Sequence, residues 1–423
     1  MTSAPAPGPE TAPGSSWYSN PDDVRALDIL ESCTPRWTGM STVGAATGSD
    51  RLLLHAGPPF HSTDDIPAPV LNSLAMACVY EGWAADADEG RRLVLTGEIT
   101  IAAAQDRRLV VPLAGVASPS MAVHVVTAQG AGGPLAERVR YAVVNEGQAH
   151  ALRLGTSDAG IPEHHRWLNG AFTDWLTDAL TAAGPVDLLP VLGAARDEGD
   201  DCHSRTVTGS RLLTEHLTSA AASTPADIAA FLDGAPAFAL NLWMAAAALS
   251  LSAADNTSGS SLITRAGGNG RRFGIQIAGL PGQWFTVPAD SPRGRVEAPH
   301  AGCRAVGAIG DSAVVDLFGF GGQSLSAAPA VRAALEGYLP PDATERPALL
   351  LERHLASAAG TPVGLTARSV ARLGSGPLVL LGMIEQTGRA GRIGGGVYEP
   401  PVSLFDDAVA ALAPAAAHRA AHS

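Results

Sequence analysis

Lysine is absent from this 423-residue sequence, so all 28 of its fixed cationic side chains are arginines. A chain without lysine can form no Schiff base and carries no phosphate-binding lysine of the P-loop type. These absences exclude pyridoxal-dependent enzymes and nucleotide-hydrolysing motors. Arginine suits the planar, bidentate recognition of carboxylates and phosphates better than lysine does.

Net positive charge and closely spaced cysteines are also lacking. The formal net charge is -13, and no basic run mixed with aromatic residues occurs, which argues against a nucleic-acid partner. The four cysteines form no CxxC pair, so we expect neither a structural zinc site nor a disulfide framework. The histidines show no strong metal-ligand spacing. We therefore expect no metal and no cofactor.

Segments typical of secretion or membrane insertion are missing as well. Residues 1–15 are rich in Pro, Ala and Gly and lack the basic and apolar regions of a signal peptide, which predicts a disordered lead-in. Residues 235–254 are long enough to span a membrane, but alanine dominates them and Asn241, Ser250 and Ser252 interrupt them. We predict a buried core helix there, no membrane contact and a cytoplasmic protein.

Hydrophobic periodicity predicts an α/β fold. Strand patterns occur at 51–56, 95–101, 109–111, 122–127, 139–144, 261–265, 273–277, 284–287 and 377–384. Helical patterns occur at 69–83, from about 86, across 164–232, and at 328–339 and 343–357. Within the helical stretch, Ser223 and Pro225 predict the cap and the first residue of a helix. The order predicts two α/β domains that flank a small helical domain.

The expected boundaries follow from this order of elements. We expect a lead-in at 1–15, an N-terminal α/β domain at 16–160, a helical domain at 161–235, a C-terminal α/β domain at 236–412 and a flexible tail at 413–423.

Several short segments combine glycine with a small hydroxyl residue and an acid, amide or histidine, a combination for which packing alone has little use. A single segment of this kind is more often a turn. Nine segments stand in order along the chain: LLLHAGPPF, YEGWA, GVASPSMAV, NEGQAHALRLG, EGDDCHSRT, FALNLWMAAA, GSSLITRAGGNGRRFGIQIAGLPGQWFTVPA, IGDSAVVDLFGFGGQSLSAAPAV and GRIGGGVYEPP.

On these segments, which span roughly residues 52–402, the chain resembles the YahG/YlbE-like family, which includes the large subunit of oxamate carbamoyltransferase. The resemblance implies an α/β fold with a helical insertion. It also implies a multi-subunit assembly, hetero- or homo-oligomeric, that passes a carbamoyl group between carbamoyl phosphate and an amide or amine acceptor. Such transfer needs an anion cradle, donors that polarise the carbonyl oxygen, and close positioning of the reactants.

Candidate residues exist for each of these roles. Asp201, His203 and Glu146 are the candidate catalytic residues, although an acid at a helix start is often only a cap. Arg265 and the glycine loop after it could bind an anion, or the loop could be a plain hairpin turn. The full set of candidate binding residues is His55, Gly57, Glu81, Ser120, Asn145, Arg205, Arg265, Asn269, Gly270, Asp311, Ser312 and Gly395. We expect these residues to converge on one pocket that grips a small anion.

The chain departs from the family pattern at two points. Where relatives carry a Cys-His-His-His stretch, this chain has Ala104-Gln105-Asp106-Arg107, and His150 stands where relatives have a lysine. We therefore expect an acceptor that is oxamate-like or belongs to specialised metabolism, and the alternative is a non-catalytic scaffold or regulatory subunit of the same kind of assembly.

Overall fold

The predicted core helix is the centre of the structure, a computed structural model that describes residues 20–129 and 139–420, with side chains described as far as residue 412. Residues 1–15 and 421–423, which carry the expected lead-in and the end of the expected tail, lie outside the described residues. Helix α10 (Phe238–Ser252) is buried along almost its whole length, as its alanine-rich composition predicts.

Among the described residues, no single helix is both long and apolar enough to cross a membrane. Helix α9 (Ala226–Asp233) and α10 together reach that length and apolar character, but the chain bends by 69° between them.

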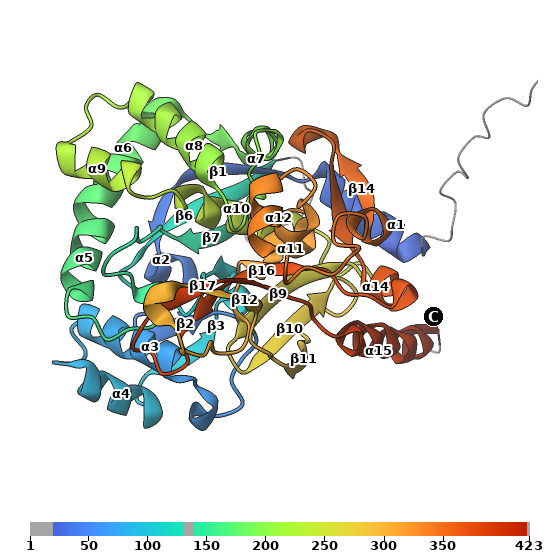
Figure 1. The fold of residues 1–423 in the computed structure, drawn as a ribbon, viewed down its shortest axis with the longest axis horizontal. Helices are drawn as coiled ribbons and strands as arrows, with labels where there is room; N and C mark the ends of the chain where they lie inside the picture. Colours follow the sequence, from blue (N-terminus) through green and yellow to red (C-terminus); the bar gives the residue numbers. More distant parts are fainter. Residues whose placement is uncertain (1–19, 130–138, 421–423) are drawn as a thin grey trace, which may run out of the picture.

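Helix α10 packs on a five-stranded sheet of order β4-β7-β6-β1-β8 (Figure 1). Strands β1 (Thr34–Thr42), β6 (Ala122–Gln129) and β7 (Val139–Val143) are antiparallel, and β4 (Leu109–Val110) runs parallel to β7. The edge strand β8 (Val186–Asp187) comes from the helical part of the chain. The strands predicted at 109–111, 122–127 and 139–144 are confirmed.

A second, three-stranded sheet has the order β3-β2-β5 and contains β2 (Leu52–His55), β3 (Thr100–Ala103) and β5 (Val116–Ala117). Helix α3 (Ala68–Tyr80) packs on it and on α4 (Ala87–Leu95). The strand predicted at 95–101 begins only at Thr100, as β3, because α4 continues to Leu95. Asp86 caps α4 by accepting from the Glu89 amide, and Glu89 accepts from the Ala85 amide.

The C-terminal part holds two more sheets and a hairpin. The sheet β11-β10-β9-β13 contains β9 (Ile263–Asn269), β10 (Arg272–Ile277), β11 (Phe285–Pro288) and β13 (Ile309–Gly310). The sheet β12-β17-β16 contains β12 (Arg293–Val296), β16 (Val379–Ile384) and β17 (Arg392–Tyr398). The predicted strands at 261–265, 273–277, 284–287 and 377–384 correspond to β9, β10, β11 and β16.

The helix predicted at 343–357 is half wrong. Helix α13 (Pro347–Leu350) is a single turn, and the chain then forms β14 (Leu351–Leu355), which pairs with β15 (Thr361–Leu365). Pairing with a neighbouring strand overrides the local helical pattern here. The helix predicted at 328–339 is present but shorter, as α12 (Pro329–Leu335).

The stretch 164–232 is helical as predicted, with α5 (Ile161–Trp167), α6 (Thr173–Ala183), α7 (Leu188–Asp197), α8 (Val207–Ala220) and α9. Helix α9 differs at its start, because Pro225 is the N-cap and Ser223 instead offers its carbonyl to Trp175 Nε1. Other helices are α1 (Pro21–Ser32), α2 (Val43–Thr47), α11 (Ala313–Phe318), α14 (Ala367–Leu373) and α15 (Val402–Ala420), which extends as backbone helix into the expected tail.

Candidate functional site

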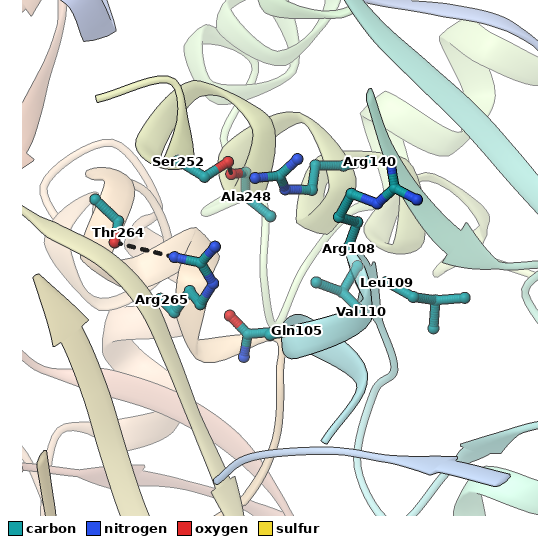
Figure 2. Close-up of a pocket in the computed structure, with 9 residues that line it drawn as sticks. All are labelled: Gln105, Arg108, Leu109, Val110, Arg140, Ala248, Ser252, Thr264 and Arg265. Carbon is teal, nitrogen blue, oxygen red and sulfur yellow. Dashed lines mark hydrogen bonds between the residues drawn. The ribbon is translucent and has the colours of Figure 1, made fainter. Parts of the chain in front are cut away.

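Three arginines from distant segments line one small cavity, which we call the arginine pocket (Figure 2). Its lining residues are Gln105, Arg108, Leu109, Val110, Arg140, Ala248, Ser252, Thr264 and Arg265. They come from β4, β7, β9, the end of α10 and the short 3-10 helix η2 (Ala104–Arg107) before β4. The cavity volume is about 10 Å³, room for about one water molecule.

Arg140 is the most deeply buried charge of the arginine pocket. It lies on β7, is 6% exposed, and donates from Nη1 to the Val139 carbonyl at 2.7 Å. Within the described part of the chain, no carboxylate lies at ion-pair distance from it. Burial and the nearby Arg265 and Arg108 guanidiniums lower the pKa of Arg140 to about 10, so it remains charged at neutral pH.

Arg265 faces the same cavity but is partly neutralised. Its Nη1 and Nη2 donate to the two carboxylate oxygens of Asp255 at 3.1 and 2.8 Å, a bidentate pair. Asp255 follows α10 and also acts on Arg140, whose pKa it raises. Arg265, the expected anion-binding residue, therefore already pairs with one carboxylate, whose charge also acts on Arg140.

Gln105 connects the arginine pocket to a buried carboxylate behind it. Its Nε2 donates to Asp311 Oδ1 at 2.6 Å and to the Ala266 carbonyl at 2.9 Å. Asp311 also accepts from the backbone amides of Gly57 at 2.8 Å and Val111 at 3.0 Å. Burial raises the pKa of Asp311 to about 7, against the three donors, which favour the ionised form.

The glycines near Asp311 permit a close approach of backbones. A Cβ on Gly57 would lie 2.4 to 2.6 Å from backbone atoms of Gly268 and Asn269, and one on Gly267 would lie 2.8 Å from Asp311 Oδ1. Asn269 donates from Nδ2 to the Pro58 carbonyl at 2.8 Å, which fastens the two loops together. Gly57, Asn269 and Asp311 therefore lie close together, although none of the three lines the arginine pocket.

Three other candidates lie close to these loops in the chain and have structural roles. His55 is buried against Phe60, and burial lowers its pKa to about 4. Gly270 turns the chain between β9 and β10 at a φ of 83°. Ser312 is buried and is the N-cap of α11, with no side-chain cap hydrogen bond.

Asp201 and His203 belong to a separate buried cluster. His203 Nδ1 lies 2.6 Å from Asp316 Oδ2, and Asp316 Oδ1 accepts from the amides of Gly322 and Leu380. Asp201 accepts from the amides of Ser204 and Arg205. Its carboxylate therefore stabilises the turn formed by residues 201–205. The Arg205 side chain, with Nε 3.4 Å from Asp200 Oδ1, is 42% exposed.

Asn145 and Glu146 form a third group. Asn145 donates to the Ala237 carbonyl and accepts from the Gly147 amide. Glu146 is 4% exposed and accepts from the Arg153 amide at 2.9 Å, while His165 Nε2 lies 4.0 Å from its other oxygen.

The last candidates are apart from all three groups. Glu81 Oε1 accepts from the amide and hydroxyl of Ser120, each at 2.9 Å. Gly395 lies inside β17, where it pairs with Arg295 and Gly382.

The arginine pocket therefore contains Arg265 but neither Asp201 nor Glu146. This corrects the expectation of a single pocket, because the acids that seemed available from the sequence are occupied by nearby backbone amides. Sequence reasoning missed Arg108, Arg140, Asp255 and Asp316, and it noted Gln105 only as a departure from the family. Among the described residues, no group of three or more His, Cys, Asp or Glu side chains could hold a metal ion.

The fold and these clusters define a mixed α/β protein whose centre holds an arginine-lined cavity. Residues 99–312 match the family described as oxamate carbamoyltransferase subunit AllG. The chain is 30% identical to the uncharacterised protein YahG of Escherichia coli K12 over 375 residues, which cover 85% of this chain and 78% of YahG. The chain belongs to this family.

Two further similarities cover nearly the whole chain. Oxamate carbamoyltransferase subunit AllG of E. coli K12 is 28% identical over 419 residues, or 92% of this chain and 97% of that protein. A crystal structure of a conserved protein of unknown function from Enterococcus faecalis V583 has a TM-score of 0.86 and 27% identity, and covers 93% of this chain and 97% of its own. The YahG/AllG resemblance and the α/β fold expected from the sequence are confirmed.

Proposed function

We propose that the chain is the catalytic subunit of a carbamoyl-transfer assembly and that the arginine pocket holds the anionic end of a reactant. That end is the phosphate of carbamoyl phosphate or the carboxylate of an acceptor. The observation that supports the proposal is the buried Arg140 guanidinium, which has no carboxylate at ion-pair distance among the described residues and faces the same cavity as Arg265. A buried cation without an ion-pair partner is costly, and a bound anion would offset that cost.

The chemistry of carbamoyl transfer fits such a pocket. The acceptor nitrogen attacks the carbamoyl carbon, a C–N bond forms, the bond from carbon to phosphate oxygen breaks, and the nitrogen loses a proton. Negative charge grows on the carbonyl oxygen and then on the leaving phosphate. Guanidinium donors fixed in a buried site stabilise that charge more than they would in water.

The size of the cavity adds a condition. At about 10 Å³ it accepts one water molecule, so a phosphate or carboxylate enters only when the arginine side chains move. Arginine has several rotatable bonds, and Arg265 already has 15% of its side chain exposed. Binding should therefore be accompanied by a rearrangement of these side chains.

The test is a carbamoyl-transfer assay on the chain together with its partner subunits. Arg140→Gln should lower kcat/KM by about 100-fold, the effect expected when one donor to a developing anion is removed. Arg332→Gln, on the exposed face of α12, is the control and should have no effect. Assembly should be checked by size-exclusion chromatography. Full turnover by an assembled Arg140→Gln variant would contradict the proposal and favour the scaffold role.

A further inference from the structure

The carboxamide of Gln105 has one possible orientation. Its two polar neighbours on one side, Asp311 Oδ1 at 2.6 Å and the Ala266 carbonyl at 2.9 Å, are both acceptors. An amide nitrogen donates and an amide oxygen only accepts, so the nitrogen must face these two groups. The oxygen of Gln105 therefore faces the opposite way. Figure 2 shows it directed into the space in front of Arg265.

That oxygen has no hydrogen-bond partner, although Gln105 is only 3% exposed. Buried side-chain acceptors are almost always satisfied, and one without a donor points to a missing group such as a ligand or a water. Gln105 lines the arginine pocket, so the missing donor belongs in the cavity.

The cavity thus makes two different demands on an occupant. The guanidiniums of Arg140 and Arg265 call for negatively charged oxygens, whereas Gln105 Oε1 calls for a donor. A simple anion without a donor group, such as acetate, meets only the first demand. An anion that carries a carbamoyl or primary amide group meets both, because its NH₂ can donate to Gln105 while its charged end faces the arginines.

We infer that Gln105 is a specificity-determining residue that accepts a hydrogen bond from the ligand's amide nitrogen in the arginine pocket. The inference rests on the proposed function, since it assumes that the pocket binds a reactant. The ligand class is a small anion bearing a carbamoyl or primary amide NH₂, and the contact discriminates it from an isosteric anion with a methyl group at that position.

The experiment measures binding of two matched pairs of ligands to the full chain by calorimetry at fixed ionic strength. The pairs are oxamate against pyruvate and carbamoyl phosphate against acetyl phosphate. In each pair the members differ by NH₂ against CH₃, with similar size and charge. The variants are Gln105→Met, which removes both donor and acceptor, and Gln105→Lys, which keeps a donor toward Asp311 and Ala266 but removes the acceptor. Exposed Gln386, replaced by Met, is the control.

The native chain should bind the NH₂ member of at least one pair about tenfold more tightly, the ratio that one ordinary hydrogen bond supports. The ratio should fall to about one in both Gln105 variants and persist in Gln386→Met. Arg140→Gln should weaken both members of a pair alike. Equal binding within both pairs, or a preference for the NH₂ member that persists in the Gln105 variants, overturns the inference about Gln105. Either result is still compatible with the proposed anion-binding role of the arginine pocket. If the native chain binds none of the four ligands, the proposed function fails as well.

Discussion

His203 Nδ1 lies 2.6 Å from Asp316 Oδ2, and the pair is buried although its members are 113 residues apart in the chain. Burial alone would lower the pKa of His203, but the carboxylates of Asp316 and Asp201 outweigh it and the pKa is raised above 6.5. Folding therefore favours the imidazolium form of His203 relative to the unfolded chain. The pair ties the α7–α8 loop to α11.

Replacing His203 by Gln should destabilise the protein by about 3 kcal/mol, because the Asp316 carboxylate would stay buried without its cation. The measurement is the free energy of unfolding in urea. Exposed His216 on α8, replaced by Gln, is the matched control and should change stability by less than about 0.5 kcal/mol. An equal effect of the two substitutions would contradict this role for the pair.

The same pair should make stability depend on pH. A histidine whose pKa is raised by folding stabilises fully below its unfolded value, near 6.5, and loses that contribution as the pH rises through the folded value. The difference in unfolding free energy between the native chain and His203→Gln should therefore be larger at about pH 6 than at about pH 9. A difference that is constant or grows with pH would mean that His203 is neutral when folded.

Gly57 should tolerate no side chain. Its φ is 74°, and a Cβ would lie 2.4 Å from the Gly268 carbonyl carbon. Gly48 has a similar φ of 68°, but nothing lies within 4 Å of the position that a Cβ would take. Gly48→Ala therefore measures only the cost of a positive φ, about 1 kcal/mol of unfolding free energy. Gly57→Ala should cost about 2 kcal/mol more by denaturant unfolding, owing to the clash. Similar losses for the two variants would show that the two loops separate easily.

Asp311 should be required for the stability of the loops behind the arginine pocket. All three of its neighbours, the amides of Gly57 and Val111 and Gln105 Nε2, are donors. In Asp311→Asn one of these three donors would face the donor NH₂ group of Asn and lose its acceptor. This should lower the free energy of unfolding by about 1–3 kcal/mol. Asp64→Asn, at an exposed position, is the control for thermal and urea unfolding. Unchanged stability of Asp311→Asn would argue against this arrangement of donors.

The sequence predicted features that follow from local composition. Helix α10 is apolar on every side, so its burial followed from composition alone. Helix α4 ends at Leu95, which is 44% exposed, and a strand was predicted there because a run of apolar residues does not distinguish a helix end from a strand. The sequence did not predict strand β14 because its residues follow a helical pattern. What makes them a strand is the pairing with β15, which a local pattern cannot show.

The candidate site could be predicted only in part, because its residues come together through contacts between distant segments of the chain. Asp311 and Gly57 were both singled out, and they meet across 254 residues. Arg140 gave no local signal, since a single arginine in a strand is usually exposed and only the tertiary fold buries it beside Arg265. The acids Asp201 and Glu146 looked available for chemistry because their backbone partners cannot be seen in a sequence.

Asp255 should limit the affinity of the arginine pocket for anions. Its carboxylate holds Arg265 in a bidentate pair, and its negative charge raises the pKa of Arg140. In Asp255→Asn one negative charge disappears while the side chain keeps its size, so phosphate should bind about tenfold more tightly. Loss of Asp255 would also let the pKa of Arg140 fall below about 10, which still leaves the guanidinium charged at neutral pH.

The affinity is measured by calorimetric titration of phosphate into the native chain and the variant at one ionic strength. Asp197→Asn, which removes an exposed acid at the end of α7, controls for the change in net charge, because a distant surface charge is screened by salt. Tighter binding in Asp255→Asn alone would place the anion beside Arg265. Unchanged or weaker binding would mean that Asp255 holds Arg265 in the orientation that the anion needs, since a guanidinium released from its partner is then free to turn away from the cavity.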